Sequence, residues 1–347
     1  MRFQARQPGG HQVTARHLLV MVMAVLVLAA RTPAQEAGKN VSLDAYAEWR
    51  HGDALVIDGQ QVRADAATNF KGRHAASFDD IELGDEVRVK GVRQANGGVL
   101  AKEVEAKPNG DALFEDDVIA VTDEVEGLWV EAGEMFEPNE DETEVEVIGE
   151  LVERGREVTR VRRIIDDLLP PYVSAEDVRV YVVDTKEWNA AAMGNGAIWV
   201  YTGLIKAMSD DELAIVLGHE LAHYTHEHSR RGAKSGMWLQ LLGMGVAAAA
   251  DAIENDVLRS TAQVAALATM SAALSKYSRT YEDQADRVGL RYVHEAGYDV
   301  TKGPGLWARF REKYGDGNKL VTFFLGSHSR PTDRIRNIER EISLNYR

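Results

Sequence analysis

The sequence predicts an α+β protein, in which a small β-barrel domain precedes a larger, mainly helical domain that contains a small β-sheet. The chain has 347 residues, enough for about two domains. Short alternating stretches separated by glycine-rich turns precede residue 107, whereas apolar residues recur at helical spacing after residue 148. Strands followed by helices, without regular βαβ alternation, are typical of an α+β domain.

The composition narrows the possible functions. The chain carries 55 acidic and 40 basic side chains, a net charge of −15, and its hydrophobic content of 45% is ordinary for a globular protein. The acidic balance argues against nucleic acid as a partner, because phosphate binding needs a clustered basic face. The chain has no cysteine, which excludes disulfides, thiol nucleophiles and cysteine-ligated zinc. Any metal must therefore be held by His, Asp or Glu.

Residues 1–34 are typical of a secretory signal peptide. A basic start without acidic residues precedes an unbroken apolar run at 18–30, and small residues around Ala34 provide a cleavage site. The run is shorter than the roughly 20 apolar residues that span a bilayer. We therefore expect export to the periplasm, with an uncleaved N-terminal membrane anchor facing the periplasm as the alternative.

Residues 38–107 are expected to form a small β-barrel. Turn signals such as Asp58-Gly59 separate short alternating stretches, as in small barrels. The segment resembles a bacterial domain of unknown function with an OB-like barrel, which implies a structural or substrate-presenting role. The alternating stretches are residues 54–58, 86–92 and 99–105, and the resemblance rests on residues 68–70 and 83–91.

The net charge is concentrated between the two domains. Residues 108–153 contain 17 acidic side chains and neither Lys nor Arg, so the rest of the chain is nearly neutral. Acidic runs are mostly solvated and loosely ordered. We therefore predict an acidic linker at residues 108–147. A calcium site is the less favoured alternative, because the spacing of a known calcium loop is absent.

The larger domain is expected to cover residues 148–347. An amphipathic pattern predicts a helix over residues 148–168, and alternating residues predict strands at 177–184 and 197–201. Ser209, with Glu212 three residues later, forms a capping box that opens the next helix, which continues through at least His223.

That helix carries residues suited to metal chemistry. Residues 219–223 read His-Glu-Leu-Ala-His, and two histidines four residues apart on a helix can reach the same ion. Glu220 projects beside them, where it can take a proton from a metal-bound water, as in the His-Glu-x-x-His zinc proteases. A helix with surface His and Glu is the alternative. The apolar residues 213–217 favour a buried helix instead.

A catalytic zinc also needs a third protein ligand and an open position for water. His226 lies on the same helix face, but three ligands on one straight helix would spread over about 10 Å, too far for one ion. The third ligand is therefore expected from another helix, where Glu282 and Asp286 lie one turn apart. We predict that Glu282 binds the metal and that Asp286 orients a ligand histidine.

Four blocks of sequence follow one another at residues 189–204, 218–223 with His228, 278–286 and 327–335. In this order they resemble the HtpX- and prenyl-protease-type zinc metallopeptidases, gluzincins whose exported bacterial members include BepA-like proteins. The resemblance implies a mainly helical zincin-type metallopeptidase domain, with His219, His223 and Glu282 as zinc ligands. It also implies that Glu220 is the catalytic base. One departure is that two residues separate His328 from the next proline, which directly follows this histidine in the family.

These features predict a zinc-dependent endopeptidase with one Zn²⁺ per chain. Zinc lowers the pKa of its bound water to about 7, and we expect Glu220 to accept the proton as this water attacks a peptide carbonyl. His328 and Arg334 are the candidate donors to the resulting oxyanion; a helix-capping role is the alternative for His328. The strand at 197–201 is expected to offer its edge to an extended substrate.

The expected substrates are unfolded or misassembled proteins of the cell envelope, which makes the function protein quality control. The partners are therefore polypeptides, without nucleic acid and with peripheral association with the membrane. The alternative is a chaperone-like or scaffolding protein that binds unfolded chains with little or gated proteolysis. Glu220 favours the enzyme, because a pure binding protein needs no catalytic base.

Overall fold

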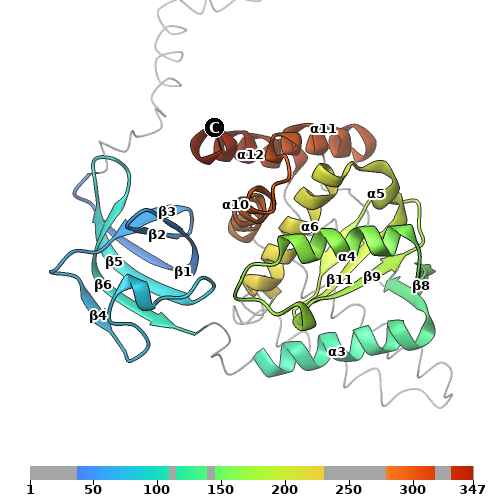
Figure 1. Ribbon diagram of the computed structural model, residues 1–347, viewed down its shortest axis with the longest axis horizontal. Helices are drawn as coiled ribbons and strands as arrows, with labels where there is room; N and C mark the ends of the chain where they lie inside the picture. Colours follow the sequence, from blue (N-terminus) through green and yellow to red (C-terminus); the bar gives the residue numbers. More distant parts are fainter. Residues whose placement is uncertain (1–36, 109–114, 139–144, 230–278, 317–329, 347) are drawn as a thin grey trace, which may run out of the picture.

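The computed structural model describes residues 37–108, 115–138, 145–229, 279–316 and 330–346 (Figure 1). The predicted signal peptide and His328 lie outside these residues, so both remain predictions. Within the described ranges, none of the helices combines the length and apolar character needed to cross a membrane. Figure 1 shows the N-terminal strands as a separate body beside the second domain, with α10 on the side that faces them.

The N-terminal domain is a curled six-stranded sheet with the strand order β3-β2-β1-β5-β6-β4. The pairings are antiparallel, except that β6 pairs in parallel with β4 and, through only two residue pairs, with β3. The core consists of side chains on its inner face, such as Leu55, Val89 and Val104. The sheet is not a closed barrel, so the expectation of a small β-barrel is corrected, because only two residue pairs join β3 to β6. The OB-like assignment remains a prediction. The strands are β1 (Asn40–His51), β2 (Ala54–Ile57), β3 (Gln60–Arg63), β4 (Asn69–Lys71), β5 (Glu86–Arg93) and β6 (Val99–Lys107).

The predicted turn at Asp58-Gly59 joins β2 to β3. Asp58 and Gly59 have φ angles of 51° and 67°. Two positive φ angles are required by the type I′ turn, the connection that matches the twist of a two-residue hairpin. The tip of this hairpin lies against α10 of the second domain, as the contacts below show.

The acidic segment at residues 108–147, which is expected to be a loosely ordered linker, contains regular secondary structure. It contains α3 (Glu115–Ala132), followed by β7 (Glu134–Pro138), which pairs with β8 (Val145–Glu150). Trp129 of α3 is 1% exposed and packs edge-on against Trp199, with ring centroids 4.8 Å apart. The expectation of a loosely ordered linker is therefore corrected for residues 115–138, because apolar residues spaced along the acidic helix are buried against the sheet.

The second domain contains a three-stranded sheet with the order β10-β11-β9. Its strands are β9 (Arg179–Val183), β10 (Ala190–Ala192) and β11 (Ala197–Tyr201). Both predicted strands are confirmed, but the expectation that residues 197–201 form an edge is wrong. β11 pairs on both sides, so it lies between β10 and β9, which are the two outer strands of this sheet.

Helices cover this sheet and form the main core. The predicted amphipathic helix is α4, but it begins only at Arg156, because residues 145–150 are strand β8 and Gly155 has a φ of 141° outside the helical region. The capping box of Ser209 and Glu212 is confirmed at the start of α6. The helices are α4 (Arg156–Leu168), α5 (Thr202–Ala207), α6 (Asp210–Thr225), α10 (Arg279–Glu295), α11 (Gly303–Tyr314) and α12 (Pro331–Asn345), with 3₁₀ turns at Phe78–Asp80, Ala175–Asp177 and Val300–Lys302.

Candidate metal centre

The two histidines of the motif lie one turn apart on α6, in the middle of the core. His219 and His223 are 2% and 1% exposed, and their Nε2 atoms lie 3.0 Å apart. This arrangement follows from the 3.6-residue helical repeat, which places positions i and i+4 on one face. Residues 213–217, just before the motif, are all buried, so the helix cannot present these histidines as surface groups.

Glu282 of α10 completes the cluster from the neighbouring helix. Its Oε1 atom lies 3.2 Å from Nε2 of His223, and its Oε2 atom lies 3.5 Å from Nε2 of His219. Donors of a tetrahedral zinc ion with bonds of about 2.1 Å lie roughly 3.4 Å apart. The three side chains therefore fit a divalent metal ion of the zinc type, and they form the three-residue cluster we call the metal centre.

Asp286 and Arg334 lie behind His219, at the ring nitrogen that faces away from Glu282. Nδ1 of His219 is 2.9 Å from Oδ1 of Asp286 and 2.6 Å from Nη2 of Arg334. This nitrogen cannot both donate to Asp286 and accept from Arg334. If Nδ1–H of His219 donates to Asp286, the lone pair is on Nε2 and faces Glu282. This is the tautomer that a metal ligand needs. Asp286 thus lies where a residue that orients His219 is expected to lie.

The charges of this cluster shift two pKa values. Burial and Arg334 oppose protonation of His219, yet the carboxylates of Asp286 and Glu282, which attract a protonated ring, raise its pKa above the usual value. Burial alone would raise the pKa of Asp286, but Arg334 and His219 outweigh burial and hold that pKa below its usual value. Asp286 is therefore a charged carboxylate at neutral pH although it is only 4% exposed.

Arg334 does not lie where an oxyanion donor would be needed. It is 1% exposed, its guanidinium lies 3.5 Å from the ring centroid of Trp307, and it forms an ion pair with Asp286. These contacts place it at Nδ1 of His219, whereas a substrate near the metal centre would approach the Nε2 side. The expectation that Arg334 donates to the oxyanion is therefore wrong, and Arg334 instead holds Asp286 in place.

Glu220 connects the motif helix to the edge of the sheet. Its side chain is 3% exposed, and its Oε2 atom accepts a hydrogen bond of 3.1 Å from the backbone N–H of Ala192 in β10. The carboxylate of Glu220 is thus fixed between the helix that carries the metal centre and β10, an outer strand of the sheet. The role of Glu220 as a base remains a prediction.

Two further residues near the metal centre were not predicted as functional. Nδ1 of His228 lies 2.8 Å from Nδ1 of His223, and Nε2 of His228 lies 2.9 Å from Oε1 of Gln284. The ring of His228 stacks on that of Tyr281, with centroids 4.8 Å apart. His228 belongs to one of the four blocks that resemble the family, and Gln284 lies between Glu282 and Asp286 in the sequence. Closeness to these motifs is the feature of the sequence that points to both residues.

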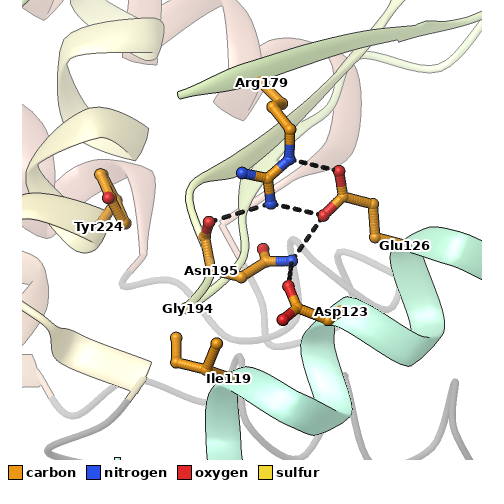
Figure 2. A pocket seen from close by; sticks show the side chains of 7 residues that line it. All are labelled: Ile119, Asp123, Glu126, Arg179, Gly194, Asn195 and Tyr224. Atoms are coloured by element: carbon orange, nitrogen blue, oxygen red, sulfur yellow. Dashed lines mark hydrogen bonds and ion pairs between the residues drawn. The ribbon is translucent and has the colours of Figure 1, made fainter. Parts of the chain in front are cut away.

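A pocket of about 390 Å³ lies between α3 and the turn that follows the edge strand (Figure 2). Nε and Nη2 of Arg179 each donate a hydrogen bond of 2.6 Å to the carboxylate of Glu126. Asn195, in the turn between β10 and β11, donates through Nδ2 to Asp123 at 2.8 Å and to Glu126 at 2.5 Å. Hydrogen bonds from Arg179 and Asn195 therefore hold the acidic helix α3 against the turn that follows β10, the strand that contacts Glu220.

Comparison with known families bears on both domains. Residues 156–342, more than half of the chain, match peptidase family M48. The chain belongs to peptidase family M48. M48 is a family of metalloproteases, and the metal centre of His219, His223 and Glu282 lies within the matched residues. Residues 45–105 match a second family, described as a domain of unknown function (DUF5666).

Individual relatives of this M48 peptidase are proteases by name, and several are named metalloproteases or metalloendopeptidases. It is 29% identical over 202 residues to the mitochondrial metalloendopeptidase OMA1 of Bos taurus, a match that covers 55% of this chain and 38% of the relative. It is 30% identical over 182 residues to a putative beta-barrel assembly-enhancing protease of Vibrio cholerae (50% and 37%). The metalloprotease YcaL of Escherichia coli is 31% identical over 180 residues (49% and 65%). The chain thus spans less than two fifths of the length of the first two relatives.

Proposed function

We propose that this M48 peptidase is a zinc-dependent endopeptidase that hydrolyses peptide bonds in unfolded or misassembled proteins of the cell envelope. One observation carries the proposal. Two histidines of α6 and a glutamate of α10 converge with their donor atoms 3.0 to 3.5 Å apart, and Glu220 directly follows the first of these histidines on α6. Two imidazoles and one carboxylate are a ligand set of catalytic zinc sites.

In this proposal His219, His223 and Glu282 hold a single Zn²⁺. When bound, the ion supplies Lewis acidity, which makes water more acidic and a peptide carbonyl more electrophilic. Glu220 accepts the proton of the attacking water and returns it to the leaving amine, as a general acid–base must. The hydrogen bond from the N–H of Ala192 holds the carboxylate of Glu220 in place for this transfer.

The substrate is proposed to bind as an additional strand at β10. This three-residue strand is an outer strand of its sheet, its residues are buried, and the backbone N–H of Ala192 donates to Glu220. Strand addition uses the backbone hydrogen bonds of the substrate more than its side chains. We therefore expect broad specificity, with extended segments of unfolded proteins preferred over folded ones.

The cellular setting is part of the same proposal. The signal-like residues 1–34 support export to the periplasm, with N-terminal membrane anchoring as the alternative and peripheral membrane association of the mature protein. The relative from Vibrio cholerae is named as a protease that enhances beta-barrel assembly, which supports substrates in the envelope. The N-terminal domain is proposed to be an OB-like module, and the pairing of β3 with β6 supports this interpretation.

The test compares wild type with Glu220→Gln on unfolded casein, with zinc content measured in both proteins. We expect Glu220→Gln to retain zinc but to lose cleavage by roughly 10²- to 10⁴-fold, because general-base catalysis contributes about that much. Glu312→Gln, an exposed glutamate on α11, is the matched control and should cleave like wild type. Equal cleavage by Glu220→Gln would refute the mechanism. Stoichiometric zinc without cleavage by either protein would favour the chaperone-like alternative.

A further inference from the structure

Glu48, on β1 of the N-terminal domain, is a buried carboxylate with partners on the metal-ligand helix α10. It is 2% exposed, and its Oε1 atom accepts a hydrogen bond of 2.7 Å from Nε2 of Gln284. Its Oε2 atom accepts a hydrogen bond of 2.8 Å from the backbone N–H of Gly59. Burying a carboxylate is costly unless hydrogen bonds or an opposite charge compensate it. The position of Glu48 therefore calls for an explanation beyond the stability of its own sheet.

The hydrogen bond to Gln284 is one link in a chain that ends at a metal ligand. Gln284 Oε1 lies 2.9 Å from His228 Nε2, and His228 Nδ1 lies 2.8 Å from His223 Nδ1. We call Glu48, Gln284, His228 and His223 the relay. It spans the boundary between the two domains and reaches the metal centre in three hydrogen bonds.

Chemistry fixes the direction of every bond in the relay. A carboxylate can only accept, so the amide NH₂ of Gln284 donates to Glu48 and the amide oxygen faces His228. Nε2–H of His228 then donates to this oxygen, which leaves Nδ1 of His228 as an acceptor. Nδ1–H of His223 donates to that acceptor. The lone pair on Nε2 of His223 consequently faces Glu282, as a metal ligand requires.

The surrounding contacts hold the two domains together at the relay. Trp49 and Val56 of the N-terminal domain are buried in the same hydrophobic cluster as the helices of the second domain. Arg287 of α10 contacts Glu48 at 3.3 Å and Asp58 of the β2–β3 turn at 3.5 Å. These neighbours leave Glu48 little freedom to move away from Gln284.

We propose that Glu48 is a positioning residue for the metal ligand His223, so that the N-terminal domain supplies the outermost part of the metal site. The inference rests on the proposed function, because it requires that His223 binds a metal. The N-terminal domain then contributes to metal affinity and does more than present a substrate. For His219 the corresponding position is filled by Asp286, from α10 itself. His223 takes its carboxylate from the other domain, through two intervening side chains.

The test measures zinc affinity in the full-length protein by competition with a chromogenic chelator, and the visible spectrum of the cobalt-substituted protein. Gln284→Met removes both relay bonds at similar volume and leaves the contacts of Glu48 with Arg287 and Gly59. Glu48→Ala removes the end of the relay. We expect each variant to raise the Kd for zinc by about tenfold, since loss of supporting hydrogen bonds typically costs about 10- to 100-fold, and to shift the cobalt bands.

Asp58→Asn is the matched control. It removes a charge that faces Arg287 at the same domain boundary, it lies outside the relay, and asparagine tolerates the positive φ of this position. We expect wild-type zinc affinity and an unchanged cobalt spectrum. A double variant tests the relay itself. Glu48→Ala should have no further effect in a His228→Phe background, because Gln284 links Glu48 to His228. Additive losses of zinc affinity would overturn the relay.

The outcomes separate this inference from the proposed function. If the wild type binds no metal, the proposed function fails, and this inference fails with it. If the wild type binds zinc while folded Gln284→Met and Glu48→Ala keep the wild-type Kd and cobalt spectrum, the positioning role of Glu48 is overturned. It is also overturned if Asp58→Asn weakens zinc binding equally, because domain docking alone would then be responsible. Thermal unfolding shows which variants are folded. If Glu48→Ala does not fold, the zinc affinity and cobalt spectrum of Gln284→Met test the inference.

Discussion

Gly218 of α6 and Gly289 of α10 face each other where the two helices cross, with no side chain between them. A Cβ atom on Gly289 would lie 2.7 Å from the carbonyl carbon of Gly218 and from the backbone nitrogen of His219. Two helices can approach this closely only where both lack a side chain. Glu282 lies two turns before Gly289 on α10, so this crossing brings its carboxylate within reach of both histidines.

Gly289→Ala is therefore expected to separate the helices and to weaken the metal centre. The added methyl group meets backbone atoms, which cannot rotate away, and overpacking of this kind costs about 1–3 kcal/mol. Chemical denaturation and zinc titration measure the two effects. Gly305→Ala on α11 is the control, because a Cβ there meets nothing within 4 Å. Unchanged stability and zinc affinity in Gly289→Ala would show that the close crossing is not required.

Arg334→Met is expected to destabilise the folded protein by about 3–5 kcal/mol, because it leaves the buried carboxylate of Asp286 without its countercharge. Denaturant unfolding at neutral pH measures this loss. Arg336 lies two residues further along α12, and its side chain is 69% exposed, so Arg336→Met should change stability by less than about 0.5 kcal/mol. Similar unfolding midpoints for the two variants would contradict the buried ion pair.

The docking of α3 is expected to weaken in acid. Burial opposes ionisation of Glu126, but hydrogen bonds from Arg179 and Tyr181 outweigh it and hold the pKa below its usual value of 4.5. A pKa lowered by folding stabilises the folded state above the unfolded-state value, and this stabilisation is lost as the pH falls through the folded-state pKa. Hydrogen exchange in residues 115–132, corrected for intrinsic rates, should therefore accelerate below about pH 4.5.

Glu126→Gln should show the faster exchange already at neutral pH, with a weaker dependence on pH. Removing the charge-assisted bonds to Arg179 should cost about 1.5–3 kcal/mol, the usual contribution of hydrogen bonds to charged groups. Glu124→Gln, at an exposed position of the same helix, is the control. If the protection of α3 is the same in both variants across the pH range, the hydrogen bonds of Glu126 do not hold the helix.

Zinc is expected to stabilise the folded protein by mass action. At a free zinc concentration of about 100 times the Kd, the free energy of unfolding should rise by about 2.7 kcal/mol. Glu282→Gln should abolish this rise, because it removes the only anionic ligand of the proposed set. Thermal or denaturant unfolding with and without zinc measures the effect. A zinc-dependent rise of the same size in Glu282→Gln would place the metal elsewhere.

Much of the metal centre could be predicted from the sequence, because helix geometry is local. The four-residue spacing of His219 and His223 places both on one face before anything is known of the fold. Glu282 could be predicted because one straight helix cannot supply three ligands, and because its block of sequence resembles a known family. The capping box at Ser209 is similarly local, and it is present at the predicted position.

The features that were missed depend on contacts between distant segments. Glu48 and Gln284 are separated by 236 positions in the chain, and no local pattern relates them. The three residues of β10 are all alanines, which have little strand propensity. The sequence therefore does not indicate this strand, and residues 197–201 look like the edge of the sheet. In α3, the acidic composition predicts a solvated segment. Val125 and Trp129 are nevertheless buried, because they pack against the sheet.

X-ray absorption at the zinc K-edge, on the purified wild-type protein loaded with one equivalent of zinc, tests most directly whether His219, His223 and Glu282 form the metal site. We expect a spectrum with two imidazole ligands and additional oxygen ligands at about 2.0–2.1 Å. Glu282→Gln should lose zinc or change the oxygen shell, while both imidazoles remain wherever zinc is still bound. A wild-type protein that binds no zinc, or a spectrum without imidazole scattering, would contradict the metal centre.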